Sequence, residues 1–181
     1  MAEEKAAYIL FGDEASFPQW GSLSYTWALR GVQPMVETSG KRKGYKVFGL
    51  IDYFTGRFFY KAHEGKLNTE SYQNFLQEVM KKTRKHIILI QDGARYHTSK
   101  AMKLFFGQHA FRLTVYQLPA YSPDYNPIEF LWKKIKQHYT HIHYFPTFES
   151  LKDKVNAALL QFKNLKQEVV MLFGLHDKLA S

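Results

Sequence analysis

Residues 122–136 read Ser-Pro-Asp-Tyr-Asn-Pro-Ile-Glu-Phe-Leu-Trp-Lys-Lys-Ile-Lys, and this stretch passes from loop into helix. Asn126 suits the N-cap, where a side-chain oxygen accepts a hydrogen bond from an early helical N–H. Pro127 suits the first helical position, where a missing N–H costs nothing. Apolar residues then recur at helical spacing and predict one buried stripe made of Ile128, Leu131, Trp132 and Ile135.

Glu129 lies beside this stripe and has three interpretations. Asn126-x-x-Glu129 has the spacing of a capping box, in which the glutamate bonds to the N-cap N–H. Lys133 follows four residues later and can form an ion pair with Glu129 on the helix surface. Glu129 can also meet other carboxylates around a metal ion, which requires partners elsewhere in the chain.

Length and composition indicate one globular domain. The chain has 181 residues, of which 45% are hydrophobic, and we expect a single domain over residues 1–181. It contains no cysteine, which excludes disulfides and thiolate zinc sites. No apolar run is long enough for a membrane span, and the start, Met1–Lys5, does not resemble a secretory signal. We expect a cytoplasmic, nucleoid-associated protein.

The chain is basic, with a formal net charge of +9, which favours a polyanionic partner. Its cations gather in three clusters: Lys41-Arg42-Lys43 with Lys46, then Lys81-Lys82 with Arg84-Lys85, then Lys133-Lys134 with Lys136. Any one cluster can be a solvated face, and the second can also balance a helix dipole. Three clusters together favour nucleic acid.

The hydrophobic pattern predicts five strands and several helices. We expect strands at Ala7–Phe11, Val47–Phe54, Arg57–Ala62, His86–Gln91 and Leu113–Leu118. We expect helices to start at Asn68 or Thr69, at Thr98 or Ser99, at Pro127, and at Thr147 or Glu149. The region from Ser16 to Lys46 has no helical period and is predicted to be a long loop or an irregular hairpin.

The resulting order is β-β-β-α-β-α-β-α, followed by more helix. Three strands in hairpin order and then alternating units predict an α/β fold with a mixed five-stranded sheet flanked by helices. This is the element order of the ribonuclease H-like fold.

Three acids are predicted to meet at one edge of this sheet. Asp13 is expected to end the first strand, Asp92 ends the fourth, and Glu129 lies in the first turn after the fifth. Ligands of open sheets gather at the carboxyl ends of strands. Adjacent strand residues point to opposite faces, so Asp13 and Glu14 are not both expected to face this site. Oxygen ligands alone suit Mg²⁺ or Mn²⁺, and two such ions can clamp a phosphodiester in line.

Four stretches of the sequence resemble the catalytic domain of DDE transposases, in the mariner-like superfamily and its bacterial insertion-sequence branch. They are Phe11–Phe17, Trp27–Pro34, Gln91–His97 and Tyr121–Trp132. The third acid is Glu129, whereas the mariner group proper has aspartate there.

The resemblance implies metal-dependent DNA strand cleavage and strand transfer, with catalytic and metal-binding roles for Asp13, Asp92 and Glu129. In this family the first acid of the Asp-Glu pair is catalytic, so the resemblance selects Asp13 and excludes Glu14. It implies two Mg²⁺ or Mn²⁺ ions, and double-stranded DNA (transposon ends and target) as partner. His97 and Asn126 are expected to support the acids or to contact DNA, although His97 can also simply pack at a helix N-terminus. DNA contacts are expected from Arg30, Lys41, Arg42, Lys43, Lys46, Lys133 and Lys136.

Family members carry N-terminal helix-turn-helix domains, and no such domain precedes Asp13. The expectation is an excised catalytic domain or one product of a split reading frame, working with a separate N-terminal DNA-binding polypeptide and as a homodimer on DNA. Two alternatives stay open: a ribonuclease H-like nuclease that cuts without joining, and an inactive DNA-binding remnant of a transposase.

Overall fold

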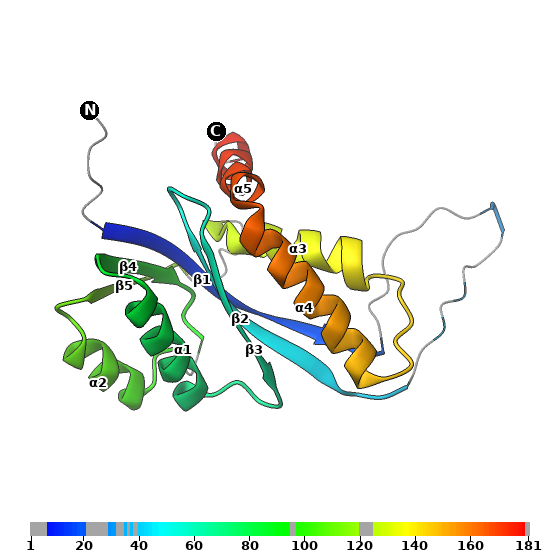
Figure 1. Cartoon of the computed structure of the whole chain (residues 1–181), viewed down its shortest axis with the longest axis horizontal. Coiled ribbons are helices and arrows are strands. Elements are labelled where there is room, and N and C mark those ends of the chain that lie inside the picture. Colours follow the sequence, from blue (N-terminus) through cyan, green and yellow to red (C-terminus); the bar gives the residue numbers. More distant parts are fainter. Residues whose placement is uncertain are drawn as a thin grey trace.

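The chain forms a five-stranded sheet with helices on both faces (Figure 1). The computed structural model describes residues 7–20, 29–31, 35, 37, 40–94, 97–119 and 125–179, with side chains to residue 174. The strands are β1 (Ala7–Pro18), β2 (Gly44–Asp52), β3 (Phe58–Glu64), β4 (His86–Gln91) and β5 (Leu113–Gln117). The helices are α1 (Thr69–Lys82), α2 (Lys100–Gln108), α3 (Ile128–Ile135), the π-helix η2 (Lys136–Thr140), α4 (Phe148–Asn164) and α5 (Lys166–Leu179).

The strand order in the sheet is β3-β2-β1-β4-β5. β1, β2 and β3 pair antiparallel, whereas β4 pairs parallel with both β1 and β5. The predicted mixed sheet, its element order and the adjacency of the first and fourth strands are therefore confirmed. In the part of the chain that the structure describes, no helix is long and apolar enough to cross a membrane.

β1 is much longer than predicted, and this changes the position of Asp13. The strand was expected to end at Phe11, but it continues to Pro18 because its pairing with β2 runs from Leu10↔Asp52 to Pro18↔Gly44. The pairing with β4 stops earlier, at Gly12↔Gln91. Asp13 therefore lies within β1, at the point where the strand loses its β4 neighbour, and not at the end of β1.

The two faces of β1 contact different helical layers, as Figure 1 shows for the helices themselves. Ala15 and Phe17 join the core beneath α3, α4 and α5, whereas Leu10 joins the core beneath α1 and α2. Because side chains alternate along a strand, Asp13 belongs to the α3 face and Glu14 to the α1 face. Each face of β1 thus presents one carboxylate.

The apolar stripe of α3 is buried as predicted, with Ile128, Leu131, Trp132 and Ile135 at most 1% exposed. Trp132 lies against Gly49 of β2, where a Cβ atom would come within 2.5 Å of the indole. The Trp132 ring also makes edge contacts with Phe17 and Phe58. This close packing holds α3, and with it Glu129, against the middle of the sheet.

Candidate active site

Asp13, Asp92 and Glu129 reach one place from three elements. Asp13 comes from β1, Asp92 follows the last residue of β4, and Glu129 lies in the first turn of α3. Burial is the largest cause of the raised pKa of both Asp13 and Glu129; the charges of Glu129 and Asp92 further raise the pKa of Asp13, and the charge of Asp92 further raises that of Glu129. The three acids that the sequence selected therefore lie within electrostatic range of one another, whereas the donor atoms that lie within 4.8 Å of one another in the described part of the chain are those of Glu14, Asp92 and His97.

Asp13 and Glu129 are in direct contact. Burial, followed by the charges of Glu129, Glu14 and Asp92, raises the pKa of Asp13 from 3.8 to about 8. The protonated Asp13 carboxyl donates a hydrogen bond to Glu129. Burial also raises the pKa of Glu129, although the nearby Lys136 ammonium opposes this shift. With a pKa of about 8, Asp13 keeps its proton at neutral pH in the metal-free protein.

Asp92 is held in a different way, by His97. The Nδ1 atom of His97 lies 2.9 Å from the Oδ1 atom of Asp92 and 3.3 Å from its backbone oxygen. A carboxylate only accepts hydrogen bonds, so Nδ1–H is the donor. This bond, helped by the backbone N–H of Ala94, lowers the pKa of Asp92. Asp92 is therefore ionised and fixed in orientation while Asp13 is still protonated.

The imidazole of His97 is buried against Tyr72 of α1. Its side chain is 1% exposed, and the ring centroid lies 4.6 Å from that of Tyr72. The Tyr72 hydroxyl donates a hydrogen bond to Gln91, the buried last residue of β4. Burial raises the pKa of Tyr72 well above its usual value, and the neighbouring acids add to this. His97 thus lies between the Tyr72 ring and the Asp92 carboxylate.

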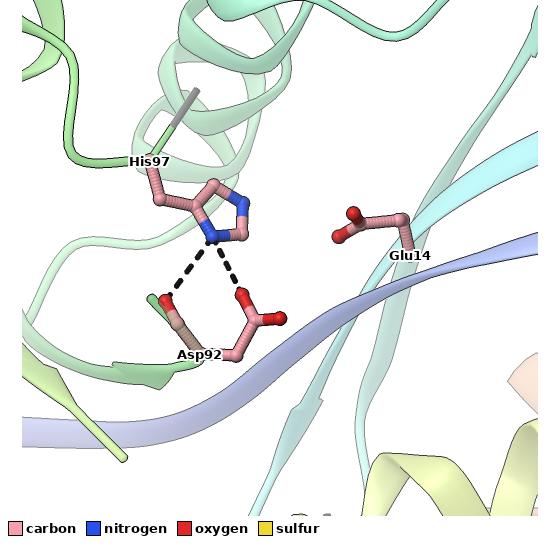
Figure 2. A group of neighbouring side chains, drawn as sticks. All are labelled: Glu14, Asp92 and His97. Atoms are coloured by element: carbon pink, nitrogen blue, oxygen red, sulfur yellow. Dashed lines mark hydrogen bonds and ion pairs between the residues drawn. The ribbon is translucent and has the colours of Figure 1, made fainter. Parts of the chain in front are cut away.

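Glu14 also belongs to this cluster, contrary to the prediction that excluded it. The ligand atoms of Glu14, Asp92 and His97 lie within 4.8 Å of one another. Figure 2 shows the Glu14 carboxylate pointing from β1 toward the imidazole of His97 and the carboxylate of Asp92. The alternation argument was correct about the faces of β1. It failed because Asp92 lies beyond the end of β4, where side chains from both faces of β1 can approach it.

Asn126 is not the helix cap that the sequence predicted. No side-chain hydrogen bond caps α3, whose N-cap is Pro127, so the predicted capping box with Glu129 is wrong. Asn126 is instead 3% exposed, and its Nδ2 atom donates a hydrogen bond to the Gly12 carbonyl over 3.0 Å. Within the described residues, Glu129 also forms no ion pair with Lys133. The two structural alternatives for Glu129 are thus not realised.

The predicted DNA-contacting residues differ in their exposure to solvent. Arg30, Lys41, Arg42, Lys43 and Lys133 are exposed. Lys46 is half-buried within β2, and Lys136 at the start of η2 acts electrostatically on Glu129. Of the stretches that carried the resemblance, residues 27–28, 32–34, 95–96 and 121–124 lie outside the described residues.

The cluster fits a hard divalent cation. Its donors are carboxylate oxygens, the ligands that Mg²⁺ and Mn²⁺ prefer. One oxygen of Glu14, Oε2, is buried and has no hydrogen-bond partner. Burial and then the neighbouring acids Glu129, Glu14 and Asp92 raise the pKa of Asp13, so negative charge is concentrated in a partly desolvated place. In the metal-free protein, protonation of Asp13 reduces this negative charge. A bound cation would offset the charge instead.

The raised pKa of Asp13 predicts how the stability of the metal-free protein depends on pH. The folded pKa of about 8 exceeds the unfolded value of 3.8, so the folded state binds this proton more tightly. The resulting stabilisation is complete below about pH 4 and is lost as the pH rises through about 8. In thermal unfolding with a chelator, the melting temperature of the wild type relative to Asp13→Asn should fall over this range. A pH-independent difference contradicts the prediction.

The fold and the position of these acids are typical of one class of protein. A mixed sheet in the order β3-β2-β1-β4-β5, with acids next to the end of β4 and on a crossing helix, is the ribonuclease H-like arrangement. A family model described as DDE superfamily endonuclease matches residues 8–152, and the chain belongs to this family. The resemblance to DDE transposases is thereby confirmed.

Individual relatives agree with this assignment. The Tc3 transposase of Caenorhabditis elegans is 29% identical over 160 residues, covering 83% of this chain and 48% of that protein. A 39 kDa protein of insertion element IS630 from Shigella sonnei is 26% identical over 149 residues, covering 81% of this chain and 43% of that protein. The chain thus spans about half the length of these curated relatives.

Solved structures share the fold at low sequence identity. The Mos1 transposase in a paired-end complex with the left transposon end gives a TM-score of 0.61 at 18% identity, covering 93% of this chain and 56% of that one. The catalytic domain of Mos1 mariner transposase gives a TM-score of 0.54 at 16% identity, covering 93% and 83%. These comparisons confirm the predicted fold class.

Proposed function

We propose that this domain cleaves DNA strands and joins them to a target, using Mg²⁺ or Mn²⁺ held by Asp13, Asp92 and Glu129. The observation that carries the proposal is the electrostatic proximity of three carboxylates from β1, the end of β4 and α3, where burial and then the neighbouring acids raise the pKa of Asp13. A purely structural role does not explain this crowding, because like charges brought together destabilise the fold.

The acids have distinct parts in the proposed chemistry. Divalent ions held by these acids would supply the activation of an attacking hydroxyl and the stabilisation of the leaving 3′ oxygen of a phosphodiester. Asp92 is ionised and fixed by His97, and it interacts with both Asp13 and Glu129, so it is best placed to bind between them. Asp13 must lose its proton before it can act as a ligand, and Glu129 completes the site from α3.

The basic residues supply a path for the DNA backbone in this proposal. Lys136 already lies close enough to Glu129 to lower its pKa, so it adjoins the acids and can contact a phosphate beside them. Five exposed cations and the half-buried Lys46 are proposed to bind phosphates further along the strand; the exposed ones are Arg30, Lys41, Arg42, Lys43 and Lys133. Affinity for DNA should then fall steeply with salt.

The relatives support the choice of DNA as substrate. Tc3 is named as a transposase, and Mos1 structures are described as a paired-end complex and a strand transfer complex. Because the chain spans about half of the curated relatives, we propose that recognition of DNA ends depends on a further DNA-binding region or a separate polypeptide. A homodimer on DNA is proposed on the same basis.

A joining assay tests the function. A short duplex with a free 3′-hydroxyl is mixed with supercoiled plasmid and Mn²⁺, and the expected product is the duplex covalently joined to the plasmid. Nicked plasmid without joined product favours the alternative nuclease. DNA binding without either reaction, and without Mn²⁺ binding, favours the inactive remnant.

A further inference from the structure

Glu14 is a half-buried acid that the three-carboxylate site leaves without a role. It lies on the α1 face of β1, opposite Asp13, and its carboxylate lies within 4.8 Å of the ligand atoms of Asp92 and His97 (Figure 2). Asp92 is thus flanked by Asp13 on one face of β1 and by Glu14 on the other.

The Glu14 carboxylate has no partner that explains its position. Its Oε2 atom is buried without a hydrogen bond. None of the ion pairs found among the described residues involves Glu14. The Nδ1 atom of His97 is already taken by Asp92. Burying an ionised oxygen without a partner costs several kcal/mol, so the position calls for a ligand.

The surroundings of Glu14 exclude a simple packing role. Glu14 pairs with Phe48 of β2, and it acts electrostatically on the buried Tyr72 of α1. An apolar residue packs against these two aromatic rings at less cost than a carboxylate does. The glutamate therefore destabilises the empty site, and a cation next to Asp92 offsets that cost.

We propose that Glu14 is a fourth carboxylate of the metal centre, binding the cation that Asp92 holds on the α1 face of β1. Two oxygens that bind one Mg²⁺ would lie at most about 4.2 Å apart, given bonds of about 2.1 Å. The 4.8 Å limit on the distance between Glu14 and Asp92 is close to this value. His97 then acts as a positioning residue, since its Nδ1–H keeps the Asp92 carboxylate turned toward the ion. The proposal rests on the proposed function of the domain.

Calorimetric titration of Mn²⁺ in the presence of a DNA duplex tests this assignment directly, without relying on activity. Glu14→Gln keeps the shape of the side chain and removes its charge, and it should weaken Mn²⁺ binding at least about tenfold. Glu14→Asp keeps the charge but withdraws it from Asp92, and it should weaken binding to an intermediate extent. The matched control is Asp153→Asn, at an exposed position on α4, which should bind Mn²⁺ as the wild type does.

Two further results separate the possible failures. The metal-free Glu14→Gln variant should melt no lower than the wild type, because it relieves repulsion among the acids, so weakened binding is not caused by misfolding. Unchanged Mn²⁺ binding in Glu14→Gln, with binding lost in Asp92→Asn, overturns the assignment of Glu14 alone. Absence of Mn²⁺ binding in the wild type overturns both this inference and the proposed metal-dependent function.

Discussion

Asp92→Asn is expected to abolish detectable Mn²⁺ binding and to slow DNA strand cleavage at least about 1000-fold. Asp92 is the acid that interacts with both Asp13 and Glu129 and has its pKa lowered by His97. Metal ions contribute several kcal/mol to the stabilisation of the transition state, and each 1.4 kcal/mol is about tenfold in rate. Calorimetry with Mn²⁺ and cleavage of end-labelled duplex measure the two effects.

The asparagine variant suits this test because it preserves the fold. Its amide oxygen still accepts the hydrogen bond from the Nδ1–H of His97, so the loop after β4 keeps its anchor. The metal-free variant should melt no lower than the wild type, since one charge leaves a crowded acidic cluster. Cleavage at the wild-type rate by a well-folded Asp92→Asn protein rejects the proposed site.

The sheet order was predictable because it depends on local patterns. His86–Gln91 is an apolar run with a helix on either side of it in sequence, which is typical of a central parallel strand. The stripe of α3 likewise follows from helical spacing alone. Asp92 and Glu129 could therefore be placed near the carboxyl end of β4 before the structure was known.

The length of β1 was not predictable in the same way. Ser16 and Gly44 look like loop residues, and their strand conformation depends on the β1–β2 pairing, which is a contact between distant segments. Propensity is a weak guide where such pairing decides the outcome. The error was consequential, because it placed Asp13 at the end of a strand when it lies within one.

The roles of Glu14 and Asn126 were missed for a related reason. Alternation along a strand gives the face of a side chain but not the point where its neighbouring strand stops. Only the early end of the β4 pairing, at Gly12↔Gln91, lets Glu14 approach Asp92. Asn126 has a local interpretation as a cap, whereas its partner, the Gly12 carbonyl, lies 114 residues away. Sequence spacing near α3 contains no signal for that contact.

Asn126→Asp is expected to slow strand cleavage about 100-fold, the second largest effect after the loss of Asp92. Asn126 links the elements of two acids: its Nδ2 atom donates to Gly12, next to Asp13, and its backbone oxygen accepts from the N–H of Glu129 over 3.0 Å. Aspartate lacks the donor, and its carboxylate faces the Gly12 carbonyl. A displacement of about 1 Å between catalytic groups can cost about 100-fold in rate.

A positioning role for Asn126 can be separated from a merely structural one. Loss of a buried hydrogen bond lowers stability by about 1–3 kcal/mol, which thermal unfolding measures. If Asn126 aligns Asp13 with Glu129, then cleavage by Asn126→Asp and Asn126→Ala should need more Mn²⁺ for half-maximal rate, at temperatures where both variants are fully folded. The control is Thr147→Ala, which removes the N-cap of α4, away from the acids. This variant should lose a similar amount of stability but keep the wild-type Mn²⁺ requirement. The opposite result is a loss of stability in the Asn126 variants with the wild-type metal dependence and rate. The hydrogen bond to Gly12 would then serve only the stability of the fold. The packing of Trp132 against Gly49 would suffice to align Glu129 with Asp13.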